Sequence, residues 1–320
     1  MVGASGSGGP VVSIDGGKSG LRLLVIDGEH REYGTGPGLT YQPHEDGVAG
    51  ILSGVRAAVA GLARVPAGAA VVAGLTVAPG DPAERDRLRW RLAELFGGPA
   101  LVVQDALLAH AGALAGPGTV ICAGTGTTVL GIDAAGRSVK IDGWGPALGD
   151  RGSAYAVGLA GLRAAAAAHD GAGAATGLTE RLTRELGGTD LARLQAFYRD
   201  DALVARVAGF ARAVVELAAR DEVAGAICDA AAADLAASAA SAADRLPGAG
   251  ARVSWSGRFV EPGGPLHARL SGALAARGLE LVAPLAGPLD GGPVLLRRGA
   301  PYGDLPELAH RTPPGTAAES

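Results

Sequence analysis

The sequence is poor in cysteine, and this excludes two classes of small-protein scaffold. Among its 320 residues only Cys122 and Cys228 are cysteines, and neither stands in a Cys-x-x-Cys or other metal-ligand spacing. A disulfide framework and a zinc site are therefore not expected. We interpret Cys122 as part of an apolar strand and Cys228 as part of an alanine-rich helix, where a thiol acts as a small apolar group.

The sequence also lacks a block of like charges. Its net charge is −4, and charged residues make up 19% of the chain. Binding to nucleic acid or to an anionic membrane by electrostatics is therefore not expected. The four arginines between positions 85 and 91 alternate with apolar and acidic residues along a helical stretch, so we interpret them as a solvated helix face.

Targeting and membrane-spanning segments are missing as well. The N-terminal MVGASGSGGP has neither a basic n-region nor an apolar h-region, which argues against a signal peptide. The alanine-rich run at 158–168 is weakly apolar and is interrupted by Arg163, so no membrane span is expected. We therefore expect a cytoplasmic protein.

Glycine is abundant, with 53 residues, and a glycine-rich turn between two apolar strands occurs twice. The first copy is VVSIDGGKSGLRLLVIDG at 11–28, and the second is TVICAGTGTTVLGIDAAG at 119–136. Backbone N–H groups in such turns can surround a phosphate, and glycine permits both close approach and positive φ angles. Two such turns in matching halves predict a cleft that holds a nucleotide from both sides.

The order of apolar strands and helices repeats in the two halves, which predicts an α/β protein of two related domains. A chain of 320 residues also exceeds the usual length of a single domain. We expect a disordered N-terminus at 1–10, an N-terminal domain at 11–116, a C-terminal domain with a helical insert at 117–298 and a flexible tail at 299–320.

The first turn consists of Asp15, Gly16, Gly17, Lys18 and Ser19. It is not a Walker A loop, because Val12 stands where that motif needs a glycine and a β pattern follows where it needs a helix. Asp15 can hold Mg²⁺ through water while the turn amides meet phosphate oxygens. The alternative is an ordinary Asp-Gly-Gly hairpin turn.

The second turn consists of Gly124, Thr125, Gly126 and Thr127, which offer hydroxyls as well as amides to an anion. Asp105 directly follows an apolar strand and opens a helix. Two interpretations of Asp105 stay open at this point. It is either the N-cap of that helix or a general base that takes the proton of an alcohol during phosphoryl transfer.

The segment DGWGPALGDRGS at 142–153 combines four glycines, a tryptophan and two aspartates before a helix that starts near Ser153. A sugar site needs this combination, because an indole covers a pyranose face while a carboxylate accepts hydrogen bonds from hydroxyls. The alternative is a Trp-anchored hinge in which Asp150 caps the helix. Further along, Gly257 follows a strand and could line an adenine pocket or simply end that strand. The dispersed histidines form no recognisable hydrolase triad.

At these residues the chain resembles the N-acetylglucosamine kinase family, within the BadF/BadG-type ATPases of the sugar kinase–Hsp70–actin superfold. The family motif Asp-Gly-Gly-Gly-Thr-Lys-Thr is similar to residues 15–20, and Gly-Thr-Gly-Ser is similar to 124–127. The signature Gly-Gly-Trp-Gly…Gly-Asp-Glu-Gly-Ser is similar to 142–153 with the same spacing. The resemblance extends over roughly residues 11–298. It implies two related ribonuclease-H-like (actin-like ATPase) domains flanking a nucleotide cleft.

The resemblance implies ATP- and Mg²⁺-dependent phosphorylation of an amino sugar, N-acetylglucosamine or glucosamine, at O6. It implies Asp105 as the general base and Asp15 as the residue that organises Mg²⁺. It also suggests a homodimer, although the sequence does not reveal the oligomeric state. The implied ATP contacts are the residues of the two turns, with Ser19 and Thr125 at the phosphates, and Gly257 near adenosine. The implied sugar contacts are Asp105, Thr128, Gly143, Trp144, Gly145 and Asp150.

Several positions depart from the family pattern. Lys18 replaces a glycine, Arg151 replaces an acidic residue, and Thr128 stands where the N-acetylglucosamine enzymes carry an asparagine. A further sugar-contacting asparagine expected near Gly38–Thr40 is absent. These changes leave phosphoryl transfer in place but leave the identity of the sugar open.

Three other functions stay open as alternatives. One is an ATPase that activates a partner redox enzyme through a shared iron–sulfur cluster, although the two cysteines look buried. Another is a sugar-sensing regulator, which would need a DNA-binding helix-turn-helix where only about ten residues precede Val11. The last is a non-catalytic sugar-binding protein.

Overall fold

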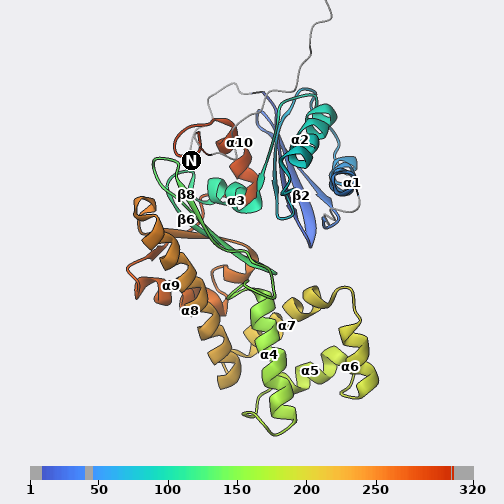
Figure 1. Ribbon diagram of the computed structural model, residues 1–320, viewed down its shortest axis with the longest axis vertical. Coiled ribbons are helices and arrows are strands. Elements are labelled where there is room, and N and C mark those ends of the chain that lie inside the picture. Colours follow the sequence, from blue (N-terminus) through green and yellow to red (C-terminus); the bar gives the residue numbers. More distant parts are fainter. Residues whose placement is uncertain (1–8, 40–45, 304, 306–320) are drawn as a thin grey trace, which may run out of the picture. The chain divides into compact units, whose positions relative to one another are not determined.

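The computed structural model describes residues 9–39, 46–303 and 305 of the chain, which form two compact units (Figure 1). The first unit contains the chain up to Leu108, residues 134–137 and the chain from Leu289 onward. The second contains 109–133 and 138–288. This division differs from the predicted boundary after residue 116, because it runs through helix α3 (Asp105–Leu114). Most of the predicted N-terminal segment and tail lies outside the described residues.

The first unit is built on a five-stranded sheet with the strand order β3-β2-β1-β4-β5. Strands β1 and β2 pair antiparallel as the predicted hairpin, whereas β4 is parallel to both β1 and β5. The elements of this unit besides α3 are β1 (Val11–Gly17), β2 (Gly20–Asp27), β3 (His30–Gly36), α1 (Gly47–Ala60), β4 (Ala70–Leu75), α2 (Pro82–Phe96), β5 (Ala100–Gln104) and α10 (Gly291–Leu296).

Helices cover both faces of this sheet. Ile14 belongs to the buried cluster that the sheet forms with α1 and α2. The neighbouring Ser13 points to the opposite face, where a Cβ on Gly292 of α10 would stand 1.9 Å from its hydroxyl oxygen. Gly74 of β4 likewise leaves room for Leu108 of α3, whose Cβ would lie 2.7 Å from an added methyl group. Because successive strand residues face opposite sides, the adjacent apolar residues of β4 are explained by this double cover, as the sequence predicts.

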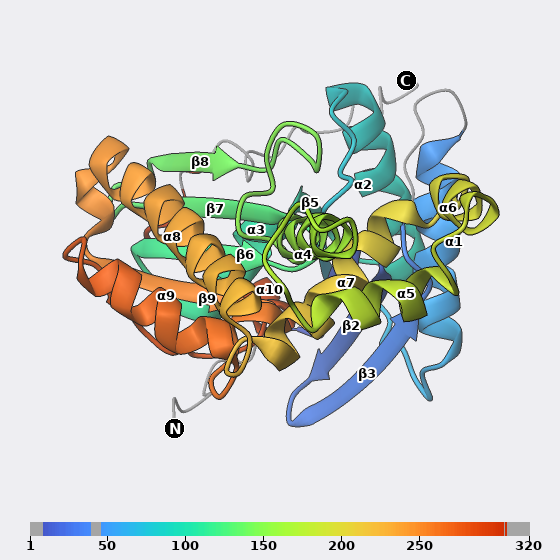
Figure 2. The ribbon, with the colours of Figure 1, turned by 90° about the horizontal axis from the view of Figure 1, so that it is seen from below.

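The second unit repeats the same sheet topology, with the order β8-β7-β6-β9-β10 (Figure 2). Strands β6 and β7 again form an antiparallel hairpin. On the other side of β6 lies β9, which is parallel to β6, and β10 is parallel to β9. This confirms the predicted α/β fold of two related domains. The elements are β6 (Gly118–Ala123), β7 (Thr127–Ile132), β8 (Ser138–Asp142), α4 (Ala154–His169), α5 (Leu178–Leu186), α6 (Leu191–Tyr198), α7 (Leu203–Leu217), α8 (Glu222–Arg245), β9 (Arg252–Ser256), α9 (Pro265–Ala275) and β10 (Glu280–Leu281).

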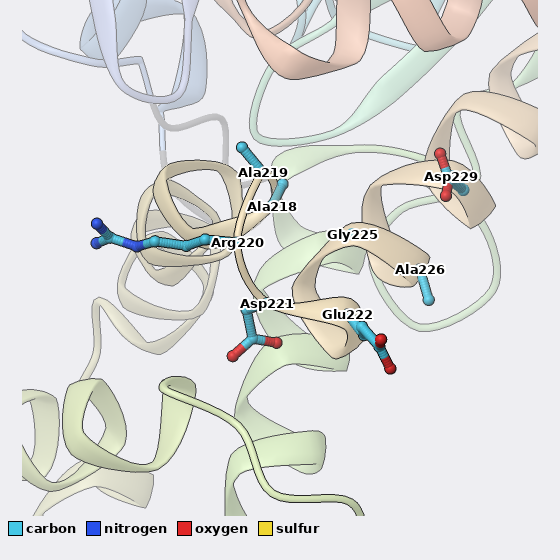
Figure 3. A pocket seen from close by; sticks show the side chains of 8 residues that line it. All are labelled: Ala218, Ala219, Arg220, Asp221, Glu222, Gly225, Ala226 and Asp229. Carbon is cyan, nitrogen blue, oxygen red and sulfur yellow. The ribbon is translucent and has the colours of Figure 1, made fainter.

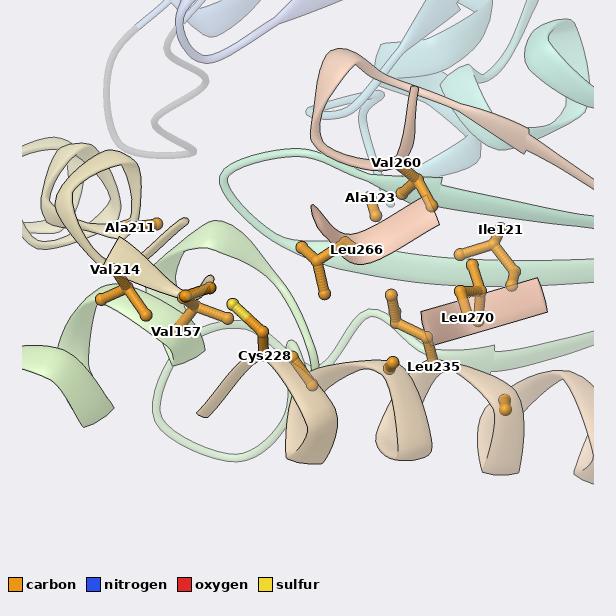
Figure 4. Packing of buried hydrophobic residues seen from close by; sticks show 14 of the residues in the cluster. Ile121, Ala123, Val157, Ala211, Val214, Cys228, Leu235, Val260, Leu266 and Leu270 are labelled. Carbon is orange, nitrogen blue, oxygen red and sulfur yellow. The ribbon is translucent and has the colours of Figure 1, made fainter. Parts of the chain in front are cut away.

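Helix α8 is the central helix of the second unit's core. Its 24 residues are long and apolar enough to cross a membrane by length and composition alone. However, Cys228 and Leu235 of α8 are fully buried within the protein and pack in a cluster with residues of the sheet and of α9, such as Ile121 and Leu270 (Figure 4). This packing is typical of the core helix of a globular domain, and it accounts for Cys228 as the buried apolar group that the sequence predicts.

Helices α4 and α7 approach each other closely at a glycine, which yields a first prediction. A Cβ on Gly158 would stand 1.8 Å from the carbonyl oxygen of Val207. We expect Gly158→Ala to force the helices apart and to lower the free energy of unfolding by about 1–3 kcal/mol. Gly209 of α7 is the matched control, because an added Cβ there has nothing within 4 Å.

Gly209→Ala should raise the free energy of unfolding by about 0.5–1 kcal/mol, since alanine is the better helix former. Urea unfolding of the two variants beside the wild type measures both effects. A gain in stability for both variants would contradict the close approach at Gly158.

Candidate functional site

In the first unit, polar side chains gather where three parallel strands end at one edge of the sheet. Asp15 lies near the end of β1, Thr76 directly follows β4, and Asp105 follows β5 and begins α3. The Thr76 hydroxyl donates a hydrogen bond of 2.6 Å to Oδ2 of Asp105. Oδ1 of Asp105 accepts from the amide of Ala106 at 2.8 Å. The carboxylate of Asp105 is therefore held in place by one hydroxyl and one amide.

Asp15 pairs with Arg22, its neighbour across the β1–β2 hairpin. The guanidinium of Arg22 donates to Oδ2 of Asp15, and the Asp15 side chain is 16% exposed whereas that of Arg22 is 62% exposed. Burial raises the pKa of Asp15, Arg22 opposes that shift, and the charge of Asp105 adds to it. Asp15 and Asp105 are thus close enough to interact. A partly desolvated carboxylate of this kind gains from a nearby cation.

The glycines of the first turn leave room and do not supply positive φ angles. Neither Gly16 nor Gly17 has φ in the left-handed region, so the expected use of glycine for positive φ is wrong here. A Cβ on Gly16 would stand 2.5 Å from Cδ1 of Leu39, whereas one on Gly17 would meet no atom closer than 3.7 Å, the hydroxyl of Thr76 being at that distance. Gly16 is therefore a packing position, whereas a side chain at Gly17 would make only ordinary van der Waals contacts with Gly20 and Thr76.

Lys18 and Ser19 form the exposed tip of this turn, between the paired residues Gly17 and Gly20. The carbonyl oxygen of Lys18 would lie 2.0 Å from a Cβ on Gly38. Only glycine therefore allows residue 38 to approach the turn. Thr40, at the end of the region where the resemblance led us to expect an asparagine, lies outside the described residues.

In the second unit, the turn between β6 and β7 is fixed to the start of α4. The carbonyl oxygens of Gly124 and Thr125 accept hydrogen bonds from the amides of Ala154 (2.9 Å) and Tyr155 (3.2 Å). The turn occupies these first-turn amides of α4, and its own amides at Gly124 and Thr127 donate to Gly126 and Asp150. An anion would therefore be met by the amides of Thr125 and Gly126. The side chain of Thr127 is buried, so its hydroxyl is less accessible than the sequence predicts.

The loop from β8 to α4 is tied together at its two ends by Asp142. Oδ1 of Asp142 accepts from the amides of Gly143 and Asp150, both at 2.8 Å. Its Oδ2 accepts from the amide (3.0 Å) and Nε (3.2 Å) of Arg151. Burial by itself would raise the pKa of Asp142, but the hydrogen bonds from Arg151, Asp150 and Gly143 outweigh it and hold the pKa below its usual value. Asp142 is therefore an ionised group that organises the loop.

Asp150 links this loop to the second turn. It is buried and has φ of +57°, and its Oδ1 accepts from the amide of Thr127 at 3.1 Å. A Cβ on Gly126 would stand 2.7 Å from the other carboxylate oxygen, so glycine is required there for the carboxylate to approach. The structure thus brings the predicted sugar carboxylate into contact with the predicted phosphate turn.

The alternative of a Trp-anchored hinge is wrong on both counts. Ser153, and not Asp150, caps α4, because its hydroxyl oxygen accepts from the amide of Ala156 at 3.1 Å. The indole of Trp144 is 73% exposed and therefore anchors nothing within the protein. Leu148, on the same loop, is also exposed.

The remaining predicted residues of this unit lie around the same loop and turn. Gly257 has φ of +104°, and a Cβ there would stand 2.3 Å from the carbonyl oxygen of Ala123, directly before the second turn. Gly143 and Gly145 both have positive φ, and a Cβ on Gly143 would stand 2.7 Å from the hydroxyl oxygen of Thr128. Glycine is therefore needed at 257 and 143 for close approach as well as for backbone conformation.

Sequence reasoning missed Thr76 and Arg22 as members of the site in the first unit. Thr76 carries the same signal as Asp105, since each directly follows a buried parallel strand. Arg22 has no local signal, because its partnership with Asp15 depends on the register of the hairpin. Among the described residues, no group of three or more His, Cys, Asp or Glu gathers as a metal site. Mg²⁺ commonly needs only one or two carboxylates besides phosphate oxygens and water, so the carboxylate of Asp15 fits that ion.

Two hollows lie in the second unit, and one of them is lined in part by Gly152, at the end of the loop from β8 to α4. One is an open hollow of about 500 Å³ at the turn between α7 and α8 (Figure 3), lined by Ala218, Ala219, Arg220, Asp221, Glu222, Gly225, Ala226 and Asp229. Asp221 accepts hydrogen bonds from Thr176, Gly177 and Ala224 and so holds this turn together. The other is an apolar groove between α4 and α8.

Comparison with known proteins identifies relatives of this arrangement. The model of the BadF/BadG/BcrA/BcrD ATPase family matches residues 80–268, more than half of the chain. The chain is 37% identical over 82 residues to the N-acetylmuramic acid/N-acetylglucosamine kinase of Clostridium acetobutylicum, covering 25% of this chain and 27% of that protein. It is 45% identical over 69 residues to the N-acetyl-D-glucosamine kinase of Dictyostelium discoideum, covering 22% of each. These matches span about a quarter of the length of each relative.

Solved structures agree over nearly the whole chain. A protein from Chromobacterium violaceum described as an N-acetylglucosamine kinase superposes with a TM-score of 0.72 at 24% identity, covering 90% of this chain and 98% of that one. A ROK family glucokinase from Streptomyces griseus, in complex with glucose and AMPPNP, superposes with a TM-score of 0.57 at 19% identity, covering 91% and 100%. At these identities the likeness establishes the fold, which is that of the sugar kinases and actin-like ATPases.

Proposed function

Because the chain belongs to the BadF/BadG/BcrA/BcrD ATPase family, we propose that it is an ATP-dependent kinase of an amino sugar. The acceptor in this proposal is the O6 hydroxyl of N-acetylglucosamine or glucosamine. The observation that carries the proposal is the hydrogen bond between Asp150 of the signature loop and the amide of Thr127 in the second turn. Through this bond a residue proposed to bind the sugar contacts a turn proposed to bind phosphate. The names of the two curated relatives support the same acceptor class.

The two turns are proposed to bind the phosphates of ATP. Residues 16–19 would offer amides from the first turn. In the second turn Thr125 and Gly126 would do so, because the amides of Gly124 and Thr127 donate to Gly126 and Asp150. Gly257, packed against the carbonyl of Ala123 at the end of β6, would lie near adenosine. Asp15 would hold Mg²⁺, directly or through water, and this requires Arg22 to share or release the Asp15 carboxylate. When bound, Mg²⁺ neutralises negative charge on the phosphate oxygens.

Asp105 is proposed as the general base. Its carboxylate would accept the proton of the sugar hydroxyl as that oxygen bonds to the γ-phosphorus and the bond to ADP breaks. The hydrogen bond from Thr76 fixes the orientation of one oxygen of this carboxylate. The products are ADP and the sugar phosphate, and the proton leaves from Asp105 to solvent.

The sugar is proposed to lie on the loop at 142–151. The exposed indole of Trp144 is free to cover an apolar face of the pyranose ring. Asp150 would accept hydrogen bonds from sugar hydroxyls, and Thr128 would contact the sugar beside it. Gly143 and Gly145 permit the backbone to approach the ring closely.

The proposal is tested by ADP release from purified protein with ATP and Mg²⁺. The panel contains N-acetyl-D-glucosamine, D-glucosamine, neutral hexoses and a sugar-free control. We expect strong release with one amino sugar and little without sugar. Sugar-independent release would favour the activator-type ATPase, which an iron assay after anaerobic purification would check. Binding of an amino sugar without release would leave a sugar-binding protein.

Location and assembly belong to the proposal as well. We propose that the protein acts in the cytoplasm, where ATP is available. A homodimer is one assembly state open to it, and the residues do not decide it. Light scattering of the purified chain measures the assembly state directly.

The raised pKa of Asp15 predicts the direction of a pH effect on stability. A carboxyl group with a higher pKa in the folded chain binds more protons when folded. The free energy of unfolding therefore falls as the pH rises through the window that begins at the ordinary value of 3.8 and ends above the folded pKa. Asp15→Asn has no proton to lose in this window, so its stability relative to the wild type should increase with pH.

Urea unfolding of both proteins at about pH 4 and about pH 7 measures this difference. The same variant should lose most of its Mg²⁺-dependent ADP release, because its side chain no longer carries the charge that holds the cation. A stability difference that stays constant with pH would contradict the burial of the Asp15 charge.

A further inference from the structure

Two departures from the family signature contact each other in the structure. Asp142 stands at the position of the first glycine of that signature, and Arg151 stands at the position of its glutamate. Nε of Arg151 donates to Oδ2 of Asp142 at 3.2 Å. The side chain of Asp142 is completely buried, whereas that of Arg151 is 55% exposed. The two replacements therefore form one ion pair inside the loop that carries the candidate sugar residues.

The carboxylate of Asp142 closes this loop. It accepts from one amide at the near end, that of Gly143, and from two at the far end, those of Asp150 and Arg151. Asp142 adopts φ of +63°, a conformation that non-glycine residues rarely adopt. A Cβ on Gly149 would stand 2.3 Å from Oδ1 of Asp142. The loop thus has space for this carboxylate only because residue 149 is a glycine.

The far end of the loop is in turn bound to the second turn. The backbone of Asp150 donates to Asp142, while the side chain of Asp150 accepts from the amide of Thr127. A displacement of Asp150 therefore changes both the sugar loop and the turn at 124–127. All these contacts lie within the second unit.

We propose that Asp142 is a positioning residue that, through Asp150, couples binding of the sugar to binding of the nucleotide. This inference rests on the proposed function, in which Asp150 contacts the sugar and the second turn contacts the phosphates. A sugar that orders Asp150 also orders the amide of Thr127 in the phosphate turn, and a nucleotide that orders this turn also orders Asp150. The sugar therefore raises the affinity for the nucleotide, and the nucleotide raises the affinity for the sugar. By linkage, the factor is the same in both directions.

The test is calorimetric titration of N-acetyl-D-glucosamine and of D-glucosamine, each with and without saturating Mg²⁺–ADP. The ratio of the two dissociation constants for one sugar is the coupling factor. In Asp142→Asn one oxygen becomes an NH₂ group, which cannot accept from the amide and Nε of Arg151. We expect the sugar Kd and KM to rise by about 10- to 100-fold, and the coupling factor to fall to about one.

Arg151→Gln is the matched control. It removes the guanidinium but keeps the backbone amide of residue 151 and the whole carboxylate of Asp142. We expect its sugar Kd to change by less than about threefold, since the Arg151 guanidinium is more than half exposed and three backbone amides still donate to the Asp142 carboxylate. If Asp142→Asn does not fold, Gly149→Ala displaces the same carboxylate from the other side and should raise the sugar Kd in the same way.

A purely structural role for Asp142 would give a different result. It would reduce the fraction of active protein and so lower the apparent kcat, while KM, Kd and the coupling factor stayed at wild-type values. That result, or a wild-type coupling factor of one, would overturn the inference and leave the proposed function intact. If the wild type binds neither amino sugar, the proposed function fails and this inference fails with it.

Discussion

Asp105→Asn should lower kcat by about 10²–10⁴-fold, because an amide cannot accept the proton of the sugar hydroxyl. The oxygen of the variant can accept from the amide of Ala106 while its NH₂ group donates to the Thr76 hydroxyl, so the geometry of the sheet edge should persist. The sugar KM should change much less than kcat, since the loss falls on the transition state. Steady-state ADP release with the best sugar of the panel measures both constants.

Thr76→Val is the control for this experiment. It removes the hydroxyl that orients Asp105 but leaves the carboxylate able to accept a proton. We expect a loss in kcat of about tenfold, the effect of one hydrogen bond of ordinary strength to a charged group. A near-normal turnover in Asp105→Asn would remove Asp105 as the base. An equal loss in both variants would mean that orientation of the side chain, and not proton transfer, limits the rate.

Asp150→Ala should raise the sugar KM by about 10²-fold, the second large effect. The change removes the carboxylate that accepts hydrogen bonds from the sugar. It also leaves the amide of Thr127, in a buried position, without its 3.1 Å partner. An unpaired buried donor is costly, so the KM for ATP should rise as well.

Asp150→Asn separates these two effects. Its side-chain oxygen can still accept from the amide of Thr127, so the turn should keep its structure and the KM for ATP should stay near that of the wild type. The sugar KM should still rise, because a neutral amide binds hydroxyls less strongly than a carboxylate does. An unchanged sugar KM in Asp150→Ala would remove Asp150 from the sugar site.

The fold was predictable from the sequence because the patterns that indicate it involve residues close together along the chain. The strand pattern around each glycine-rich turn and the repeated order of elements predicted two related α/β domains, and both sheets have the same topology. The signature at 142–153 likewise depends on spacing within twelve residues. The placement of Asp105 after a buried strand followed from the same kind of pattern.

Tertiary structure alone decided which polar groups are partners. The contacts of Arg22 with Asp15 and of Thr76 with Asp105 join residues from different elements, and no spacing in the sequence encodes them. It also decided the role of Gly16, which packs against Leu39 and does not need a positive φ.

The sequence by itself determined the element order, the two glycine-rich turns and the types of residue available to the site. It left two interpretations each for Asp105 and for the loop at 142–153. The structure rules out the capping role of Asp150, because Ser153 caps α4 while Asp150 binds the amide of Thr127, and the role of the loop in sugar binding stays a proposal. Residue type and periodicity act over a few neighbours along the chain, whereas a buried carboxylate takes its hydrogen-bond donors from whichever backbone the fold brings to it.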